Sequence, residues 1–229
     1  MTAEQERMAD LADGDALAER VAIRLRDMVI KGALRPGDRI VERRLCAELN
    51  VSRTPMREAL KLLRQDGLVE ISRNRGARVL SFDPVEAIDL FEVIAALEAE
   101  AAARFCASAS DETLSGLEAL HARMLFFRAA GDLDGYFDAN SVIHDAIIEG
   151  AGNAVLSDSH SRLMLRARRG RYMAIMDISR LDQAVREHEA LMATLRARSV
   201  DAARAIWRVH LLNTGSSVSK ALAGDDTDA

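Results

Sequence analysis

The chain has 229 residues and a formal net charge of −5, and 49% of its residues are hydrophobic while only 4% are aromatic. This length suffices for one large domain or two small ones, and the abundance of Ala, Leu, Arg and Glu predicts a mostly helical protein. No apolar run approaches the ~20 residues of a membrane span, and the polar start is not a signal peptide. Two isolated cysteines make no disulfide framework, so we expect a cytoplasmic protein without a membrane partner.

Charge is distributed unevenly along the chain. Residues 20–82 contain 15 Lys and Arg against 7 Asp and Glu, a balance of +8. Residues 83–229 contain 15 against 23, a balance of −8. A basic segment followed by an acidic one indicates a polyanion-binding module attached to a second domain.

The first elements lead up to the basic segment. Residues 1–14 are polar and acidic, and we expect them to be a flexible tail. Residues 16–31 have the apolar spacing of an amphipathic helix, and the sequence GALRPG at 32–37 is a turn that ends it. A second, short helix is expected to begin near Val41.

A third helix, between Ser52 and Gly67, is predicted to have two different faces. Ser52 occupies an N-cap position, and Gly67 ends the helix. An apolar stripe recurs with helical spacing at Met56, Ala59, Leu60 and Leu63. A second stripe, about 110° around the helix, consists of Arg53, Arg57, Lys61 and Arg64. Such a helix suits the major groove of DNA; the alternative, a solvated charged face, is disfavoured by the elements around it.

A β-hairpin is expected next. Residues 68–71 and 77–80 read as two strands, and residues 72–76 (SRNRG) have turn chemistry, with two arginines and a glycine at the tip. Two helices, a basic helix and a basic hairpin, in this order, are typical of a winged helix-turn-helix, which we assign to residues 15–81.

The remainder is predicted to be an all-α helical bundle. After a linker at 81–84, helices are expected at 84–107, 111–130, 133–149, 154–177, 180–198 and 200–222. Residues 223–229 are expected to be a second flexible tail. The fold class is therefore mostly α, with a winged helix-turn-helix at 15–81 followed by a helical domain at 82–222.

Three histidines are predicted to point into this bundle from different helices. His144, His188 and His210 each share a helix face with apolar residues, and Asn140 precedes His144 by one turn. Any one of them could be a hydrogen-bonded core histidine. If the three converge, neutral imidazoles make a good site for a divalent metal. The other two, His121 and His160, are expected to be structural or surface residues.

The sequence of residues 32–79, GALRPGDRIVERRLCAELNVSRTPMREALKLLRQDGLVEISRNRGARV, resembles the N-terminal domain of GntR-family bacterial transcription regulators. The resemblance implies that Arg43 contacts a phosphate or a base, and that Gly76 lets the wing approach the minor groove. It also implies three residues that enter the major groove, namely Arg53, Thr54 and Arg57. At the wing tip, Arg73 and Arg75 could contact phosphates.

Residues 84–222 resemble the C-terminal ligand-binding domain of the FadR subfamily, the FCD type, at DLFEVIAALEAEAAARFCA, DANSVIHDAIIEGAGN, REHEALMATLRARSVDAA and WRVHL. Many members bind a divalent metal with an Asp and three His. This chain matches at His144, His188 and His210, but Asn140 stands at the Asp position. The resemblance thus implies a Zn, Ni, Fe or Mn ion, held more weakly because an amide oxygen is neutral.

The same resemblance implies a small-molecule effector, an organic acid bound near the metal. Family members often carry an Arg on the first helix of this domain, where this chain has Ile94. Another arginine is therefore expected to pair with the acid. From the candidates at Arg162, Arg166, Arg168, Arg169 and Arg171, we select Arg166, and we expect Asn213 to contact the effector too.

The leading hypothesis is a homodimeric transcriptional regulator, a repressor, that binds an inverted-repeat DNA operator and responds to this metabolite. The effector would shift the distance between two DNA-reading heads. The alternative is a metal-dependent hydrolase that uses the three-histidine site, although no motif such as HExxH is present. A third possibility, an architectural DNA-binding protein, leaves more than half of the chain without a role.

Overall fold

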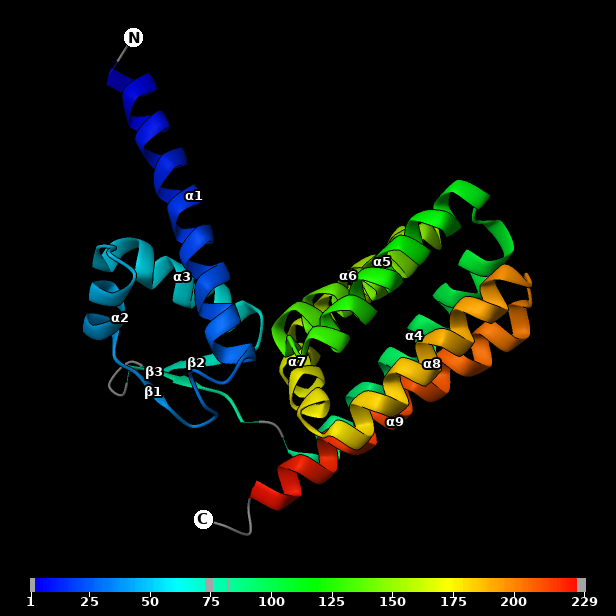
Figure 1. Ribbon diagram of the computed structural model, residues 1–229. Helices are drawn as coiled ribbons and strands as arrows, with labels where there is room; N and C mark the ends of the chain where they lie inside the picture. The colour runs from blue at the N-terminus through cyan, green and yellow to red at the C-terminus, as the bar shows by residue number, and fades with distance from the viewer. Residues whose placement is uncertain (1–2, 73–75, 82, 226–229) are drawn as a thin grey trace. The chain divides into compact units, whose positions relative to one another are not determined.

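The computed structural model describes residues 3–72, 76–81 and 83–225. The chain forms two compact units, Met1–Phe82 and Asp83–Ala229 (Figure 1). Their boundary lies one residue beyond the one expected from the sequence. Each unit has its own core, and within the described residues no helix is long and apolar enough to cross a membrane.

Within its described residues, the first unit consists of three helices and a three-stranded antiparallel sheet. Its helices are α1 (Ala3–Ile30), α2 (Glu42–Glu48) and α3 (Arg53–Gln65). Its strands are β1 (Arg39–Ile40), β2 (Val69–Ser72) and β3 (Gly76–Val79), in the order β1-β3-β2. The register pairs Ile40 with Ala77 and Val69 with Val79. The sequence did not predict β1, because two residues are too short to show the alternation of a strand.

Helix α1 begins much earlier than expected. It includes residues 3–14, for which the sequence predicted a flexible tail. The physical reason is that these residues include many good helix formers and no proline, so a helix whose later turns pack against the core can continue towards the N-terminus. The remaining residues of the two predicted tails, 1–2 and 226–229, lie outside the described residues.

The core of the first unit lies between α1, α3 and the sheet. The apolar stripe predicted for α3 is fully inside it, since Met56, Ala59, Leu60 and Leu63 are at most 2% exposed. Leu25 of α1 and Val79 of β3 are buried in the same cluster. Because burial of one such side chain contributes about 1.5–3 kcal/mol, this stripe fixes which face of α3 remains in water.

The second unit is a bundle of helices with short connections. Its helices are α4 (Pro84–Ser108), α5 (Asp111–Ala130), α6 (Leu133–Gly150), α7 (Ala154–Met176), α8 (Ile178–Arg196) and α9 (Val200–Asp225). The predicted bounds lie within three residues of these. Side chains cap several of the helices at their N-termini, namely Asp83, Ser110, Asp132, Asn153 and Asp177.

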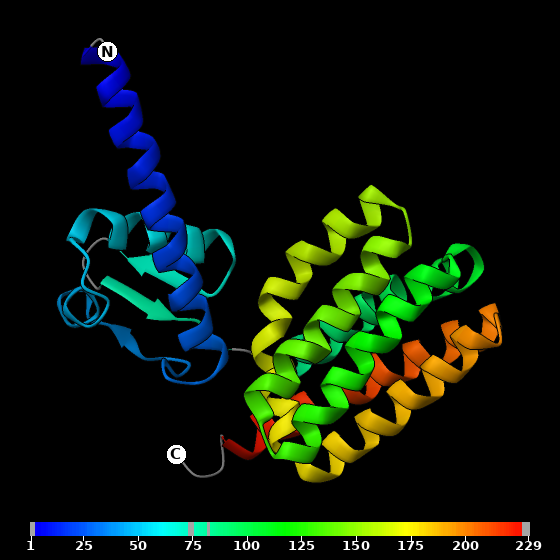
Figure 2. The same cartoon turned by 45° about the horizontal axis from the view of Figure 1, so that its top comes forward.

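Small residues allow α9 to approach its neighbours closely. Helix α9 packs along α4 and also against α7 and α8, and Figures 1 and 2 show α8 and α9 side by side. A Cβ atom on Gly215 would lie 2.5 Å from Cβ of Phe91, and one on Gly170 would lie 2.9 Å from Cγ1 of Val218. Glycine at both positions therefore holds α9 tight against α4 and α7, and this places the side chains that follow.

Candidate functional site

The basic face of α3 is exposed, as predicted. Arg53, Arg57, Lys61 and Arg64 all point into solvent, and so do Thr54 on the same helix and Arg43 on α2. Two of these cations already have carboxylate partners. Arg57 Nε lies 3.1 Å from Glu42 Oε2, and Lys61 Nζ lies 2.8 Å from Glu58 Oε1. Exposed pairs of this kind contribute little free energy, so phosphate oxygens can replace the carboxylates.

The wing is the hairpin of β2 and β3. Its Gly76 has a φ of +76°, in the left-handed region that favours glycine, and a Cβ atom there would approach Nε of Arg39 to 3.9 Å. The other two residues predicted to contact DNA at the tip, Arg73 and Arg75, lie outside the described residues.

The interior of the second unit brings three histidines together; the sequence predicted that they point inward but left their convergence open. His144 of α6, His188 of α8 and His210 of α9 are buried, and one nitrogen of each lies within 4.8 Å of the others. Trp207 closes one side of this cluster, with its ring 4.6 Å from that of His210 and nearly parallel to it. Three helices far apart in sequence thus supply one set of imidazole nitrogens.

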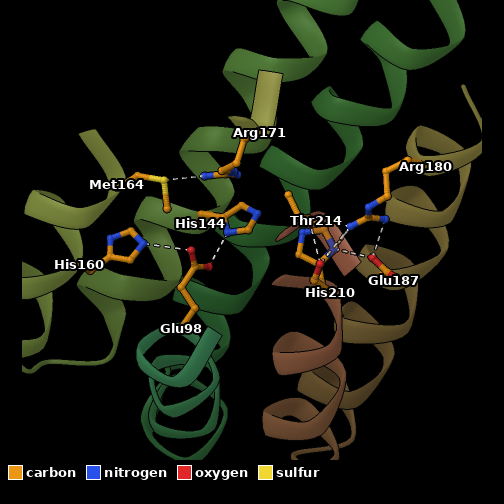
Figure 3. A network of polar contacts seen from close by, with 9 residues as sticks. All are labelled: Glu98, His144, His160, Met164, Arg171, Arg180, Glu187, His210 and Thr214. Atoms are coloured by element: carbon orange, nitrogen blue, oxygen red, sulfur yellow. Dashed lines mark hydrogen bonds and ion pairs between the residues drawn. The ribbon is translucent and has the colours of Figure 1, made fainter. Parts of the chain in front are cut away.

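Two carboxylates lie behind the histidines and orient them (Figure 3). Glu98 of α4 is fully buried, and its Oε2 accepts a hydrogen bond from Nδ1 of His144 at 2.5 Å. Glu187 of α8 holds Nδ1 of His210 at 2.7 Å in the same way. Each bond leaves the Nε2 atom of that histidine for another partner. This is the arrangement in which outer carboxylates fix the tautomer of metal-binding histidines.

The other two histidines are structural, but they lie in the interior. His160 is buried and donates from Nε2 to Oε1 of Glu98 at 3.0 Å. His121 is buried, and its ring is parallel to that of His188 at a centroid distance of 6.2 Å. Glu98 therefore joins two histidines, and His188 is held between ring neighbours.

The three clustered histidines are neutral. Burial, assisted by the nearby positive charge of Arg171, lowers the pKa of His144 to about 3. Burial also lowers the pKa of His188 well below its usual value, and that of His210 below it. Burial alone would raise the pKa of Glu98, but the hydrogen bonds that its carboxylate accepts from His144 and His160 hold this pKa well below its usual value. Neutral imidazoles are the form that binds metals.

The polar atoms at this site fit a divalent metal. Nε2 of His144 and both ring nitrogens of His188 are buried and have no hydrogen-bond partner in the part of the chain that the structure describes, and the same holds for Oδ1 of Asn140, one turn before His144 on α6. Buried polar atoms in proteins nearly always have partners, so this concentration of unpaired donors and acceptors points to a ligand. Three imidazoles and an amide oxygen are suitable donors for Zn, Ni or Fe.

The two predicted effector contacts, Arg166 and Asn213, each have a partner within the chain. Arg166 is half exposed and forms an ion pair with Glu86, and its pairing with an effector acid stays a prediction. Asn213 donates from Nδ2 to Oε1 of Glu187 at 2.6 Å and lines a groove of about 430 Å³ between α8 and α9.

Sequence reasoning did not predict which charged residues are buried around the histidines, although it named Arg171 among the candidates to pair with the acid. The buried charged residues are Glu98, Arg171, Arg180 and the half-buried Glu187. Arg180 donates to Glu187 at 3.0 Å, to Oγ1 of Thr214 at 2.8 Å and to the backbone oxygen of His210 at 3.0 Å. One signal was available, because Glu98 interrupts an otherwise apolar face of α4, which is unusual for a carboxylate unless it has a buried partner.

Comparisons with known proteins match each of the two units to a known protein family. Residues 17–79 match the family of bacterial regulatory proteins, gntR family, and residues 89–213 match the FCD domain. The HTH-type transcriptional repressor GlaR of Escherichia coli is 27% identical over 215 residues, which cover 88% of this chain and 95% of GlaR. The Nta operon transcriptional regulator of Aminobacter aminovorans is 41% identical over 92 residues, 39% of this chain and 43% of that protein.

Solved structures show the same fold. The structure of E. coli McbR/YncC has a TM-score of 0.77 at 21% identity, covering 90% of this chain and 97% of that one. A transcriptional regulator GntR from Rhodococcus sp. RHA1 has a TM-score of 0.73 at 25% identity, with the same coverage. The matched families are regulators and not enzymes, so the hydrolase alternative has no support. With the FCD match spanning more than half of its length, the chain belongs to the GntR family of bacterial transcriptional regulators, with an FCD domain at its C-terminal side.

Proposed function

We propose that this protein is a homodimeric repressor that responds to an organic acid bound at a metal in the FCD domain. The observation that carries the proposal is the convergence of His144, His188 and His210, two of them oriented by buried carboxylates. A packed core has no need for so many unpaired polar atoms. An effector site that reports on a metabolite does need them.

The metal is held by the three histidines with Asn140 as the fourth ligand. A divalent ion bound there supplies a coordination position for an effector carboxylate. Because all four ligands are neutral, the site favours Zn, Ni or Fe, which bind imidazole well, over Mn, which prefers carboxylate oxygens. Glu98 and Glu187 supply negative charge from behind the ligands and keep the imidazoles in one orientation.

The operator is read by the basic face of α3 and by the wing. Arg53, Thr54 and Arg57 enter the major groove, Arg43 contacts the backbone or a base, and the wing residues Arg73, Arg75 and Gly76 approach the minor groove. One winged helix reads only a few base pairs, so a dimer on an inverted repeat gives the specificity that a regulator needs. Such a protein acts in the cytoplasm, where the operator DNA is.

Repression is supported by the name of one relative, GlaR, which is called a repressor. In this proposal the effector binds more tightly to an arrangement of the dimer that does not fit the operator. A ligand can shift the equilibrium only by its difference in affinity for the two arrangements, and a coupling of 1–3 kcal/mol corresponds to roughly 5–150-fold in operator affinity.

The test starts with genomic DNA fragments selected by the full-length protein. Footprinting of the selected DNA should show two protected half-sites, and light scattering should give a dimer. Fluorescence anisotropy then measures operator affinity for the Zn-loaded protein with and without small carboxylic acids. At least one acid should weaken operator binding by fivefold or more. Sequence-independent binding, or an operator affinity that no acid changes, would contradict the proposal.

A further inference from the structure

Arg171 of α7 is a buried cation with few partners. Arg171 is only 4% exposed. Nη1 donates to the sulfur of Met164 at 3.5 Å, and Nη2 is buried without a partner among the described residues. A thioether is a weak acceptor, and a buried guanidinium normally pairs with a carboxylate or a phosphate. Arg171 is therefore prepared to bind an anion that the chain itself does not provide.

Arg171 lies next to the histidine cluster. Figure 3 shows its guanidinium directed towards the ring of His144. An anion on Arg171 would therefore be close to a metal held by the three clustered histidines.

Tyr136 offers a second donor, one turn before Asn140 on the buried face of α6. It is fully buried two turns before His144 on α6, and its hydroxyl has no partner in the described chain. Burial raises the pKa of Tyr136 to about 12, against the opposing charges of Arg180 and Arg171. The hydroxyl therefore remains a neutral donor. A guanidinium and a hydroxyl together suit one carboxylate.

The carboxylates of Glu98 and Asp145 attract Arg171, but neither is hydrogen-bonded to it in the described chain. Both oxygens of Glu98 accept hydrogen bonds from histidines, His144 and His160. Arg180 is already paired with Glu187 and Thr214, so it does not offer a comparable site. Among the described residues of this unit, Arg171 is thus a buried arginine to which no carboxylate is hydrogen-bonded.

The charge of the interior indicates the charge of the ligand. Glu98 and Glu187 are balanced by Arg171 and Arg180, and the three histidines are neutral. A divalent metal adds two positive charges, and the neutral amide of Asn140 does not offset either of them. A buried site of this kind is most stable when the ligand supplies both negative charges, because uncompensated charge in a poorly hydrated interior is costly.

A route to Arg171 is also present. Met164 and His160 line a pocket of about 340 Å³ formed by α6 and α7. Met164 is the residue that touches Arg171, and its unbranched side chain can move at little cost. A small ligand that enters this pocket can reach Arg171 by displacing one flexible side chain.

We propose that Arg171 and Tyr136 form a carboxylate-binding subsite, and that the effector is a small dicarboxylate with one carboxylate on the metal and the other on this subsite. This inference rests on the proposed function, because it takes the histidine-bound metal as the first anchor. Arg171 then replaces the arginine that family members carry at the position of Ile94.

The experiment is calorimetric titration of the full-length, Zn-loaded protein with succinate, glutarate and adipate. The matched monocarboxylates butyrate, valerate and hexanoate lack only the second charge. One dicarboxylate should bind at least tenfold more tightly than the monocarboxylate of equal length. In Arg171→Met this preference should disappear, with a dicarboxylate affinity reduced about 10–100-fold, as expected for a charge-assisted hydrogen bond. Monocarboxylate affinity should change less than about twofold.

Three variants keep the test specific to the subsite. Arg162→Met removes an exposed arginine from the same helix and should leave the preference unchanged. Tyr136→Phe should reduce dicarboxylate affinity by a smaller factor than Arg171→Met. Arg171→Lys keeps the charge and should retain part of the preference, which guards against a folding defect in Arg171→Met. Zinc content should equal that of the unmodified protein in all of them.

Two negative results have different meanings. A Zn-loaded protein that binds dicarboxylates and monocarboxylates equally, or whose preference persists in Arg171→Met, overturns the subsite and leaves the metal site intact. A protein that takes up no Zn and binds none of the acids overturns the proposed function, and the subsite with it.

Discussion

The carboxylate of Glu98 lies 2.5 Å from Nδ1 of His144, and both side chains are fully buried. This contact joins α4, the first helix of the FCD domain, to the helix that carries two of the proposed metal ligands. Because Nδ1 is occupied, only Nε2 of His144 can bind a metal. The metal site therefore depends on a residue that would not itself touch the ion.

Glu98→Gln should weaken metal binding without removing a ligand. The amide keeps the size of the side chain but loses the negative charge that orients His144 and makes it a stronger donor. We expect the affinity for Zn to fall by about 10–100-fold, as is typical when an outer carboxylate is lost. Competition with a chromophoric chelator measures it. The control is Glu100→Gln. Glu100 lies on α4 like Glu98, is half exposed and pairs with Arg204, so this variant should leave the affinity for Zn unchanged.

Removal of a basic side chain from α3 should weaken DNA binding in one of two ways. Arg57→Ala and Arg53→Ala should each cost about 1–3 kcal/mol on the selected operator if they contact bases, with relaxed specificity at one position. If they contact phosphates instead, the loss should be similar for all sequences and the dependence on salt should become less steep. Arg208→Ala, an exposed arginine of α9, is the control for a simple loss of charge. Unchanged affinity in both variants would contradict the proposed role of α3.

Gly215→Ala should destabilise the second unit. The new methyl group would lie 2.5 Å from Cβ of Phe91, so α9 would have to move away from α4. Overpacking of this kind costs about 1–3 kcal/mol. Gly116→Ala on α5 is the matched control, because its methyl group meets no atom within 4 Å and should stabilise the helix by up to about 1 kcal/mol. Urea unfolding followed by fluorescence reports on this unit, since Trp207 is the single tryptophan of the chain.

The metal-free protein should lose stability as the pH falls below 6.5. The pKa values of His144, His188 and His210 are lowered in the folded state, to about 3 for His144, so the unfolded chain binds more protons in this range. Their contribution is complete above pH 6.5 and is lost on acidification, at about 1.4 kcal/mol per histidine per pH unit. Urea unfolding with a chelator at pH 7.5, 6.5 and 5.5 measures it, and His188→Gln should reduce the slope. A stability that stays constant or rises on acidification would show that these histidines are charged in the fold.

Much of this fold could be predicted from the sequence, because its signals are local. Caps such as Asp83 and Ser110 mark where helices begin, and helical spacing showed which side of α3 is buried. The histidine cluster could be predicted because each histidine shares a helix face with apolar residues. Convergence itself required the tertiary arrangement of α6, α8 and α9.

The buried charges could not be predicted in the same way. Arg171 belongs to a run of arginines whose other members mostly reach water, and helical spacing alone does not show which guanidinium faces the interior. Arg180 and Glu187 form an ion pair and lie two turns apart on the same helix. Pairs of this kind are ordinarily found on the protein surface. The burial of this pair depends on α9, whose His210 and Thr214 provide the remaining hydrogen bonds.

The most direct test of the account is the metal content of the purified, untagged protein by elemental mass spectrometry. The account predicts close to one Zn, Ni or Fe ion per chain, and almost none in His188→Ala, whose ligand nitrogens have no other partner in the described structure. Circular dichroism should show that the variant remains helical. Absence of bound metal in the unmodified protein, even after incubation with each of these ions, would contradict the account, because the three histidines would then line the interior without a metal.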